Sequence, residues 1–359
     1  MLQTITSYLE STGCTFPEIG LLQPADPFLD TTGEDLRRRI FITQENSGAM
    51  LCLRPEFTVP VCLAHLQNSN PAARYAYGGS VFRQRSDEAS EFIQAGYEDL
   101  GNSDTASADV ECINTALGVM EACNKSGANL VLGDQSIFMK LLDALEIPDA
   151  WRKKLGRAFG DTELLRAQLD AMSQDNGAEL QGLPRGVLAA IATQNQPKVI
   201  DEIAQLMAAD GLPLTGGRTP KAVAERVLEK VVLGANSLEK DKREALEAFL
   251  EIDVILSKAS DAIAEFEQEF GLSLNGASEN IAALCKGIGE QAEKTSYRAR
   301  FGRRLDYYTG LVFEIYGQDS DKPLIGGGRY DRLLTLLGSE TEIPAVGFAI
   351  WVDRLGEVS

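Results

Sequence analysis

The densest group of side chains that could do chemistry lies near the C-terminal end of the chain. Its six residues are Arg303, Arg304, Leu305, Asp306, Tyr307 and Tyr308. If this stretch is a strand, alternate residues face opposite sides, so Arg303 shares a face with Tyr307 but not with Tyr308. An arginine there can bind a carboxylate, and a tyrosine can contact a ring or a polar group. The alternative, which composition alone favours, is an ordinary strand end with solvated charges.

A second polar group occurs where a predicted strand leads into a predicted helix. Glu56 and Thr58 follow Leu53-Arg54-Pro55, and Pro60 is tolerated in the first turn of the helix. A carboxylate and a hydroxyl two residues apart at such a corner can face one cavity, where they would suit a ligand ammonium group. The alternative is that these side chains only cap the helix.

A third group lies on one face of a predicted strand over residues 92–100. Phe92, Gln94, Gly96 and Glu98 alternate along it and therefore share that face. The glycine would let a ligand approach the backbone between an amide and a carboxylate. The alternative is an ordinary strand with one polar face.

A glycine run, Gly326–Gly328, precedes a predicted short helix. Glycines permit a close approach of ligand to backbone, and a helix start presents free N–H groups. A run of this kind is a weak signal by itself, and a plain turn is the alternative.

The composition excludes several classes of protein. The chain has 359 residues, 44% of them hydrophobic and 24% charged, which is ordinary for a globular protein of two domains. Its net charge of −19 argues against nucleic acid as a partner, because the longest basic run is Arg37–Arg39. No apolar run approaches the length of a membrane span, so we expect no membrane partner.

The cysteine and histidine content argues against a metal site. No two of the six cysteines form a Cys-x-x-Cys pair, and His65, the single histidine, lies in an apolar helical run. We therefore expect His65 and the cysteines to be structural, with no metal and no cofactor. Free cysteines and the lack of a signal peptide predict a cytoplasmic location.

The pattern of elements predicts an α+β fold. Hairpins dominate both ends of the chain, which predicts a mainly antiparallel sheet with helices on one side. We expect a core over residues 1–145 and 291–359, interrupted by a mostly helical insertion over 146–290 that includes one amphipathic run, Leu238–Phe270. The other predicted elements are helices over 3–12, 105–123 and 351–355, and strands over 39–43, 50–53, 74–77, 80–83, 129–132, 297–316 and 345–350.

Taken in order, these motifs resemble the histidyl-tRNA synthetase core, which is a class II aminoacyl-tRNA synthetase fold. The resemblance covers roughly 1–135 and 295–359. It rests on Leu53-Arg54-Pro55-Glu56-x-Thr58, Phe82-Arg83, Gln94-x-Gly96-x-Glu98, Arg303-x-Leu305-Asp306-Tyr307-Tyr308, Gly326-Gly327-Gly328-Arg329-Tyr330-Asp331 and Ala345–Leu355.

The resemblance implies a histidine pocket. By that analogy the ligand's ammonium group would be held by Glu56, Thr58 and Gln94. Glu98 and Tyr308 would bind the imidazole nitrogens, Arg303 would face the carboxylate, and Tyr307 would complete the pocket. The resemblance also implies that Arg83 and Arg354 remain from an ATP site.

Three departures from the synthetase pattern argue against aminoacylation. Ser90 stands where these enzymes usually have an arginine that meets ATP, and the preceding loop carries Asp87 and Glu88, which would repel a triphosphate. Trp351 replaces a small glycine and could occupy space meant for adenine. The synthetases continue into an anticodon-binding domain, which we do not expect here after Ser359.

A histidine-binding core with these departures resembles the regulatory subunit of short-form ATP phosphoribosyltransferase. The resemblance implies a non-catalytic subunit that forms dimers and joins the short catalytic subunit in a hetero-octamer. It also implies that the complex performs the first step of histidine biosynthesis, with L-histidine as feedback inhibitor. The alternatives are a truncated synthetase-like enzyme that adenylates histidine or a related amino acid, and a histidine-binding scaffold with another partner.

Overall fold

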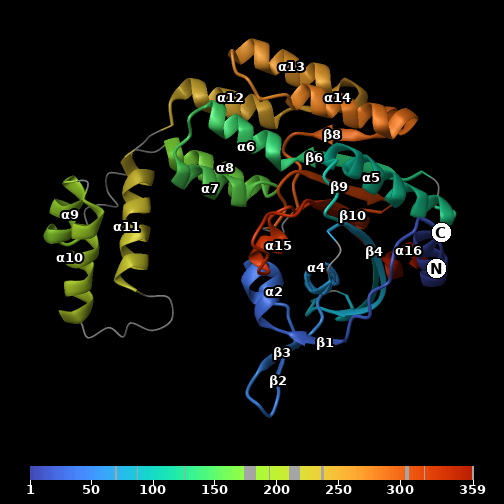
Figure 1. Ribbon diagram of the computed structural model, residues 1–359. Helices are drawn as coiled ribbons and strands as arrows, with labels where there is room; N and C mark the ends of the chain where they lie inside the picture. The colour runs from blue at the N-terminus through green and yellow to red at the C-terminus, as the bar shows by residue number, and fades with distance from the viewer. Residues whose placement is uncertain are drawn as a thin grey trace. The chain divides into compact units, whose positions relative to one another are not determined.

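The protein is described here from a computed structural model (Figure 1). The described residues are 1–68, 71–86, 88–125, 127–173, 183–193, 195–209, 219–235, 238–303, 307–318 and 320–357. They group into two compact units. The first contains Met1–Ala144, Phe159–Asp161 and Ala248–Ser359, and the second contains Leu145–Ala158 and Thr162–Glu247.

An eight-stranded sheet forms the centre of the first unit, in the order β4-β5-β11-β10-β9-β6-β8-β7. All neighbouring strands are antiparallel except β6 and β8. This agrees with the predicted antiparallel sheet. The strands are β4 (Ala73–Phe82), β5 (Glu91–Leu100), β6 (Asn129–Asp134), β7 (Asp253–Ile255), β8 (Ser296–Arg298), β9 (Leu311–Tyr316), β10 (Pro323–Arg329) and β11 (Ala345–Trp351).

A smaller sheet, in the order β1-β3-β2, precedes it in the chain. Its strands are β1 (Leu22–Pro24), β2 (Ile42–Gln44) and β3 (Met50–Leu53). β3 leads through Arg54–Phe57 into helix α4 (Thr58–Gln67), as the sequence predicts. This corner is held from inside, because the Arg54 guanidinium donates to the backbone oxygens of Ile19 and Ser80.

Helices pack along the large sheet in the first unit. Helix α5 (Thr105–Ala122) begins with Asp104, whose carboxylate accepts from the Ser107 N–H at 3.1 Å. Its buried side packs against β5, β10 and β11. The other helices of this unit are α1 (Leu2–Ser11), α2 (Asp26–Thr31), α3 (Glu34–Arg37), α6 (Gln135–Ala144), α13 (Ala259–Phe270), α14 (Ala277–Ile288), α15 (Leu333–Leu336) and α16 (Val352–Glu357), with 3-10 turns η2 (Leu256–Lys258) and η3 (Gly289–Lys294).

Gly78 and Gly79 lie inside β4, not between two strands as predicted. They pair with Ala95 and Gln94 of β5 in an unbroken ladder. Their missing side chains matter for packing instead. A Cβ on Gly78 would lie 2.9 Å from the Leu2 side chain, and one on Gly79 would lie 2.8 Å from the Arg54 guanidinium. The glycines therefore serve close approach and not a turn.

The predicted amphipathic run over 238–270 is several elements. Helix α12 (Lys240–Leu250) ends before β7, and η2 and α13 follow. β7 pairs with β8 at the edge of the large sheet, and α13 and α14 pack together in the same unit. Residues 248–290 thus belong to the first unit, although their helical pattern predicted them as part of the insertion. A three-residue strand leaves too little alternation to be recognised inside a charged helical pattern.

The second unit is helical in its described residues. It contains α7 (Asp149–Ala158), α8 (Thr162–Ser173), α9 (Arg185–Ala192), α10 (Gln196–Ala209), α11 (Pro220–Ala235) and most of α12. Helices α9, α10 and α11 share a small core of buried aliphatic side chains, which includes Val187, Val199 and Ile203. Arg243 of α12 ties this helix to α8 through Asp170 at 2.7 Å.

Within the described residues, no helix is both long and apolar enough to cross a membrane. In the same residues, no group of three or more cysteine, histidine or acidic side chains is arranged to hold a metal ion. His65 is buried, and its Nδ1 lies 3.1 Å from the Tyr75 hydroxyl. This is the structural role predicted for it.

Candidate ligand-binding pocket

A pocket opens on the face of the large sheet opposite α5, where about 470 Å³ of space, part of it open to solvent, is free of protein atoms. All seven predicted histidine-binding residues and Arg83 line it, whereas Arg354, in the described part of the chain, does not. The lining residues are Leu36, Glu56, Thr58, Arg83, Gln94, Glu98, Arg303, Tyr307, Tyr308, Gly326, Tyr330, Gly347, Phe348, Ala349 and Trp351.

Glu98 is the acceptor at the centre of the pocket. Its Oε1 accepts from the Thr58 hydroxyl at 2.7 Å and from the Tyr77 hydroxyl at 3.2 Å. Its Oε2 accepts from the Tyr330 hydroxyl. The side chain is 1% exposed, and burial raises the pKa of Glu98 to about 8, against the lowering effect of these hydroxyls. Glu98 can therefore exchange a proton near neutral pH.

Gly347 makes room for this carboxylate. It pairs with Glu98 across β5 and β11, and a Cβ at this position would lie 1.7 Å from Glu98 Oε2. A glycine in β11 is therefore required for the observed position of the acid.

Glu56 caps the first turn of α4. Its Oε2 accepts from the Thr58 N–H at 2.6 Å and its Oε1 from the Val59 N–H at 2.9 Å. Glu56 therefore caps the helix, which was the alternative given for this motif, and the same side chain also lines the pocket. Burial raises the pKa of Glu56, and the Val59 N–H and the Arg83 guanidinium oppose the rise. A ligand cation would add a third partner to a carboxylate that is already fixed.

Gln94 presents an unused acceptor. It is 1% exposed, and among the described residues its side-chain oxygen has no hydrogen-bond partner. Leaving a buried acceptor unpaired costs free energy that a ligand donor would recover. Gln94 therefore points to a ligand with an N–H group.

Arg303, like Arg83, is an arginine that lines the pocket. Its Nη1 donates to the Tyr308 hydroxyl at 3.0 Å, and its Nε lies 3.2 Å from Glu314 Oε1. Burial raises the pKa of Tyr308 to about 12, and Arg303 opposes the rise. Gly326 leaves space for this arrangement, since a Cβ there would lie 2.4 Å from the Arg303 guanidinium. The prediction that Arg303 and Tyr308 face opposite sides of a strand is wrong, because the two side chains contact each other and residues 303, 307 and 308 lie between β8 and β9. Residues 304–306 lie outside the described residues.

The glycine run of the sequence lies within β10, not before a helix as predicted. Gly327 pairs with Phe313 of β9 and with Phe348 of β11. A Cβ on Gly327 would lie 2.4 Å from the backbone oxygen of Gly347. The run therefore lets neighbouring strands and the Arg303 side chain approach closely, and it presents no helix start to a ligand.

Gly96 does not offer a ligand the backbone approach that the sequence suggested. A Cβ on Gly96 would lie 2.2 Å from the Tyr77 hydroxyl, which fills this space. Two tyrosines that the sequence did not predict as site residues contact Glu98: Tyr330 also lines the pocket, whereas Tyr77 lies behind it. Tyr330 could have been found by alternation, because it lies two residues beyond Gly328 and thus on the pocket face of β10.

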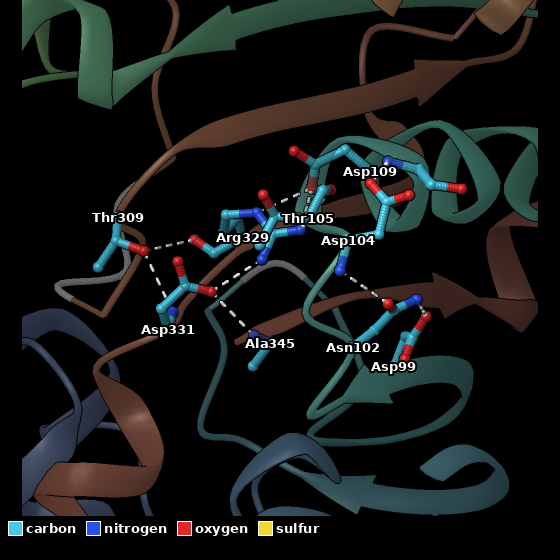
Figure 2. A network of polar contacts seen from close by, with 10 residues as sticks. Asp99, Asn102, Asp104, Thr105, Asp109, Thr309, Arg329, Asp331 and Ala345 are labelled. Carbon is cyan, nitrogen blue, oxygen red and sulfur yellow. Dashed lines mark hydrogen bonds and ion pairs between the residues drawn. The ribbon is translucent and has the colours of Figure 1, made fainter. Parts of the chain in front are cut away.

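A buried polar network fixes the segment that carries Tyr330 (Figure 2). The Arg329 guanidinium donates to Asp109 of α5 at 2.6 Å and to Asp331 at 2.9 Å. Asp331 also accepts from the Ala345 N–H at 2.8 Å and donates its own N–H to the Thr309 hydroxyl at 3.1 Å. The residues that flank Tyr330 are thus tied to α5, to β11 and to the segment after Tyr308.

Trp351, which lines the pocket, lies close to two guanidinium groups. Its ring has the Arg303 guanidinium at 5.9 Å and the Arg354 guanidinium at 4.7 Å from its centre. Arg354 donates to the Pro323 oxygen at 2.8 Å and pairs with Glu88 at 3.3 Å. Both arginines expected from an ATP site are present, but Arg354 is engaged by the chain's own carboxylate.

A family model described as histidyl-tRNA synthetase matches residues 1–215 and 218–355. An ATP phosphoribosyltransferase regulatory subunit of Chelativorans sp. (strain BNC1) is 44% identical over 346 residues, covering 95% of this chain and 92% of the relative. A regulatory subunit of the same name from Mesorhizobium japonicum is 47% identical over 344 residues, covering 94% of this chain and 91% of the relative.

Two solved structures share the fold. One, described as an ATP phosphoribosyltransferase regulatory subunit/histidyl-tRNA synthetase from Bacillus halodurans C, has a TM-score of 0.65 at 20% identity and covers 99% of this chain and 77% of that one. The histidyl-tRNA synthetase of Nostoc sp. PCC 7120 has a TM-score of 0.64 at 18% identity, covering 99% and 70%. These likenesses confirm the predicted class II synthetase-like α+β fold.

Proposed function

We propose a histidine-sensing role for this chain, which belongs to the histidyl-tRNA synthetase family and, within it, to the ATP phosphoribosyltransferase regulatory subunits. It is a non-catalytic regulatory subunit of ATP phosphoribosyltransferase in histidine biosynthesis, and catalysis belongs to the partner subunit. What we add is the site and the identity of the effector.

The observation that carries the proposal is the complementarity between the pocket and free histidine. The unpaired Gln94 oxygen, with Glu56 and Thr58 beside it, suits the ligand's ammonium group. Arg303 suits the carboxylate, because a guanidinium can donate two parallel hydrogen bonds to it. Glu98 and Tyr308 suit the two imidazole nitrogens, since an acid and a phenol together can accept from one and donate to the other. Tyr307 closes the pocket beside them.

Histidine binding would then bias the complex toward a less active state. Such an effect requires only that the ligand-bound and empty states contact the catalytic subunit differently, and a coupling of about 1–3 kcal/mol is typical. We also propose, from the same resemblance, that this chain forms a dimer and that it joins the short catalytic subunit in a hetero-octamer. The cytoplasmic location expected from the sequence also stays a prediction.

The proposal is tested by mixing this chain with a short catalytic subunit and assaying phosphoribosyl transfer across a histidine titration. We expect Glu98→Gln and Tyr308→Phe to shift the inhibition curve to at least about tenfold higher histidine, because each removes an imidazole partner. Assembly, followed by size-exclusion chromatography, should be unchanged. Wild-type inhibition in both variants would show that histidine acts elsewhere.

A second candidate function is adenylation of histidine or a related amino acid. It is favoured by Arg83, which lines the pocket and donates to the Pro55 oxygen at 2.6 Å. Histidine-dependent exchange of pyrophosphate into ATP separates the two functions. We expect no exchange above background, and measurable exchange would make the chain an enzyme.

A further inference from the structure

The turn between α7 and α8 packs against the residue that precedes Arg303 in the chain. This turn, Phe159–Asp161, belongs to the first unit, so the contact lies within that unit. A Cβ on Gly160 would lie 2.6 Å from the carbonyl carbon of Gly302, and one on Gly302 would lie 2.8 Å from the Gly160 Cα. Two backbones that approach this closely leave no room for a side chain at either position.

The turn is held in a conformation that favours glycine. Gly160 has a φ of 85°, in the left-handed region that other residues seldom adopt. Its neighbour Phe159 is buried and stacks on Phe138 of α6, with ring centres 4.9 Å apart. A Cβ on Gly302 would also lie 2.7 Å from the Phe159 ring. The turn is therefore anchored on α6 and forms a fixed surface against Gly302.

The residues on either side of Gly302 also pack against glycines. A Cβ on Gly133 of β6 would lie 2.1 Å from the backbone oxygen of Phe301. A Cβ on Gly326 of β10 would lie 2.4 Å from the Arg303 guanidinium. Because the interior is closely packed around this segment, Gly302 cannot be displaced without moving Arg303 as well.

We infer that Gly160 is a positioning residue for Arg303. The guanidinium of Arg303 lies 3.0 Å from the Tyr308 hydroxyl and 3.2 Å from Glu314, and it keeps this place only if Gly302 can lie against the turn. A guanidinium that binds a carboxylate through two parallel hydrogen bonds must be placed to within about 0.5 Å. This role rests on the proposed function, in which Arg303 binds the carboxylate of histidine. It gives the predicted insertion, 146–290, a part in the affinity of the pocket.

The test compares calorimetric titrations of the full-length chain with L-histidine and with histamine, which lacks the carboxylate. The wild type should bind histidine at least about tenfold more tightly than histamine, because only histidine can pair with Arg303. In Gly160→Ala this preference should fall to about threefold or less, since the added Cβ displaces Gly302 and with it the guanidinium. Histamine affinity should stay within about twofold of wild type, whereas general damage to the pocket would weaken both ligands alike.

Gly13→Ala is the matched control. Gly13 has a φ of 83°, so alanine adds the same backbone strain there, but nothing lies within 4 Å of the added Cβ. This variant should keep the wild-type preference for histidine. Gly302→Ala presses on the same contact from the other side, at a residue without a positive φ, and should reproduce the loss seen in Gly160→Ala. It carries the comparison if Gly160→Ala does not fold.

Crystal structures of ligand-free wild type and Gly160→Ala provide a readout that needs no ligand. In the variant, the Arg303 guanidinium should leave Tyr308, Glu314 or both. The positioning role is refuted if the guanidinium keeps both contacts, if histamine loses as much affinity as histidine, or if Gly13→Ala loses the preference equally. A wild type without any preference for histidine would instead refute the carboxylate contact of the proposed function, and the crystal structures would then decide the role of Gly160.

Discussion

At the scale of single residues, replacing Gln94 should affect the stability of the ligand-free protein and its affinity for histidine in opposite directions. Replacing it with methionine removes an acceptor that has no partner among the described residues, so the ligand-free protein should be as stable as wild type or more stable by about 1 kcal/mol. The same change should weaken histidine binding about tenfold or more, because a hydrogen bond to the ammonium group is lost. Urea unfolding and calorimetric titration measure the two effects.

Tyr97→Phe is the matched control for Gln94→Met. Tyr97 lies on the opposite face of β5, and its buried hydroxyl likewise has no partner among the described residues. Its removal should leave stability equal or higher and histidine affinity unchanged. If both variants lose affinity equally, the effect comes from repacking of β5 and not from a lost ligand contact.

The raised pKa of Glu98 predicts how the unfolding free energy of the protein changes with pH. Its pKa is about 8 in the folded protein against 4.5 unperturbed, so between these values the folded state holds a proton that the unfolded state has released. The contribution of Glu98 to stability is therefore full below about pH 4.5 and is lost as the pH rises through about 8. The unfolding free energy of the ligand-free wild type should fall over this window more steeply than that of Glu98→Gln.

Urea titrations at four pH values from 5 to 8 would provide this comparison for the two proteins. Other buried acids contribute to both curves, since burial also raises the pKa of Asp109 to about 6 and that of Glu56. The difference between wild type and variant isolates Glu98. Parallel curves would mean that the three hydroxyls around Glu98 keep it ionised at all of these pH values.

The sequence predicted the residues that line the pocket better than the residues that hold them in position. The resemblance to the synthetase core implied the seven residues from Glu56 to Tyr308, and all seven line one pocket. Alternation by itself correctly placed only Gln94 and Glu98 on a common face. Tyr77 was missed because it reaches Glu98 from the neighbouring strand, across the space that Gly96 leaves. The Arg329–Asp109 pair was missed because it joins residues 220 positions apart.

At the scale of elements, adjacent glycines of β10 should differ in what they tolerate. Gly327→Ala would place a Cβ 2.4 Å from the Gly347 backbone oxygen and 2.6 Å from Phe348, which cannot move without shifting β11. We expect a loss of about 1–3 kcal/mol in unfolding free energy. The nearest atoms to a Cβ in Gly326→Ala belong to the Arg303 guanidinium, the end of a long side chain, so this change should cost less stability but should weaken histidine binding.

The comparison uses urea unfolding for stability and calorimetric titration for affinity. Each variant serves as the control for the other, because the same methyl group is added to opposite faces of one strand. Equal losses of stability with unchanged histidine affinity in Gly326→Ala would mean that Arg303 does not contact the ligand.

Glycine-rich strands were the elements that sequence patterns described least well. Gly78-Gly79 fell between the strands predicted over 74–77 and 80–83, and Gly326–Gly328 were predicted before a helix with a plain turn as the alternative, yet both groups lie within paired strands. The local chemistry of glycine is the same in a turn and at a close contact, and only the partner decides between them. The partners here are Arg54, Arg303 and the backbone of β11, which lie far from these glycines in the sequence.

At the scale of the whole molecule, the two tryptophans of the chain lie in different units. Trp351 lines the pocket of the first unit, and Trp151 is a buried residue of α7 in the second. Each unit has its own buried apolar side chains and can therefore unfold as a separate cooperative block. A ligand stabilises only the block that binds it.

The fluorescence of one tryptophan should therefore respond to histidine binding, and that of the other should not. In Trp151→Phe, the fluorescence emission of the remaining Trp351 should change on titration with histidine. The thermal transition that this emission reports should rise by several degrees at a histidine concentration of about 100 times the dissociation constant, because binding then stabilises the folded state by about 2.7 kcal/mol. In Trp351→Phe, the emission of Trp151 should not change on titration, and its transition should stay in place. Equal shifts in both variants would mean that the two units unfold as one, whereas a response of Trp151 alone would place the histidine site in the helical unit.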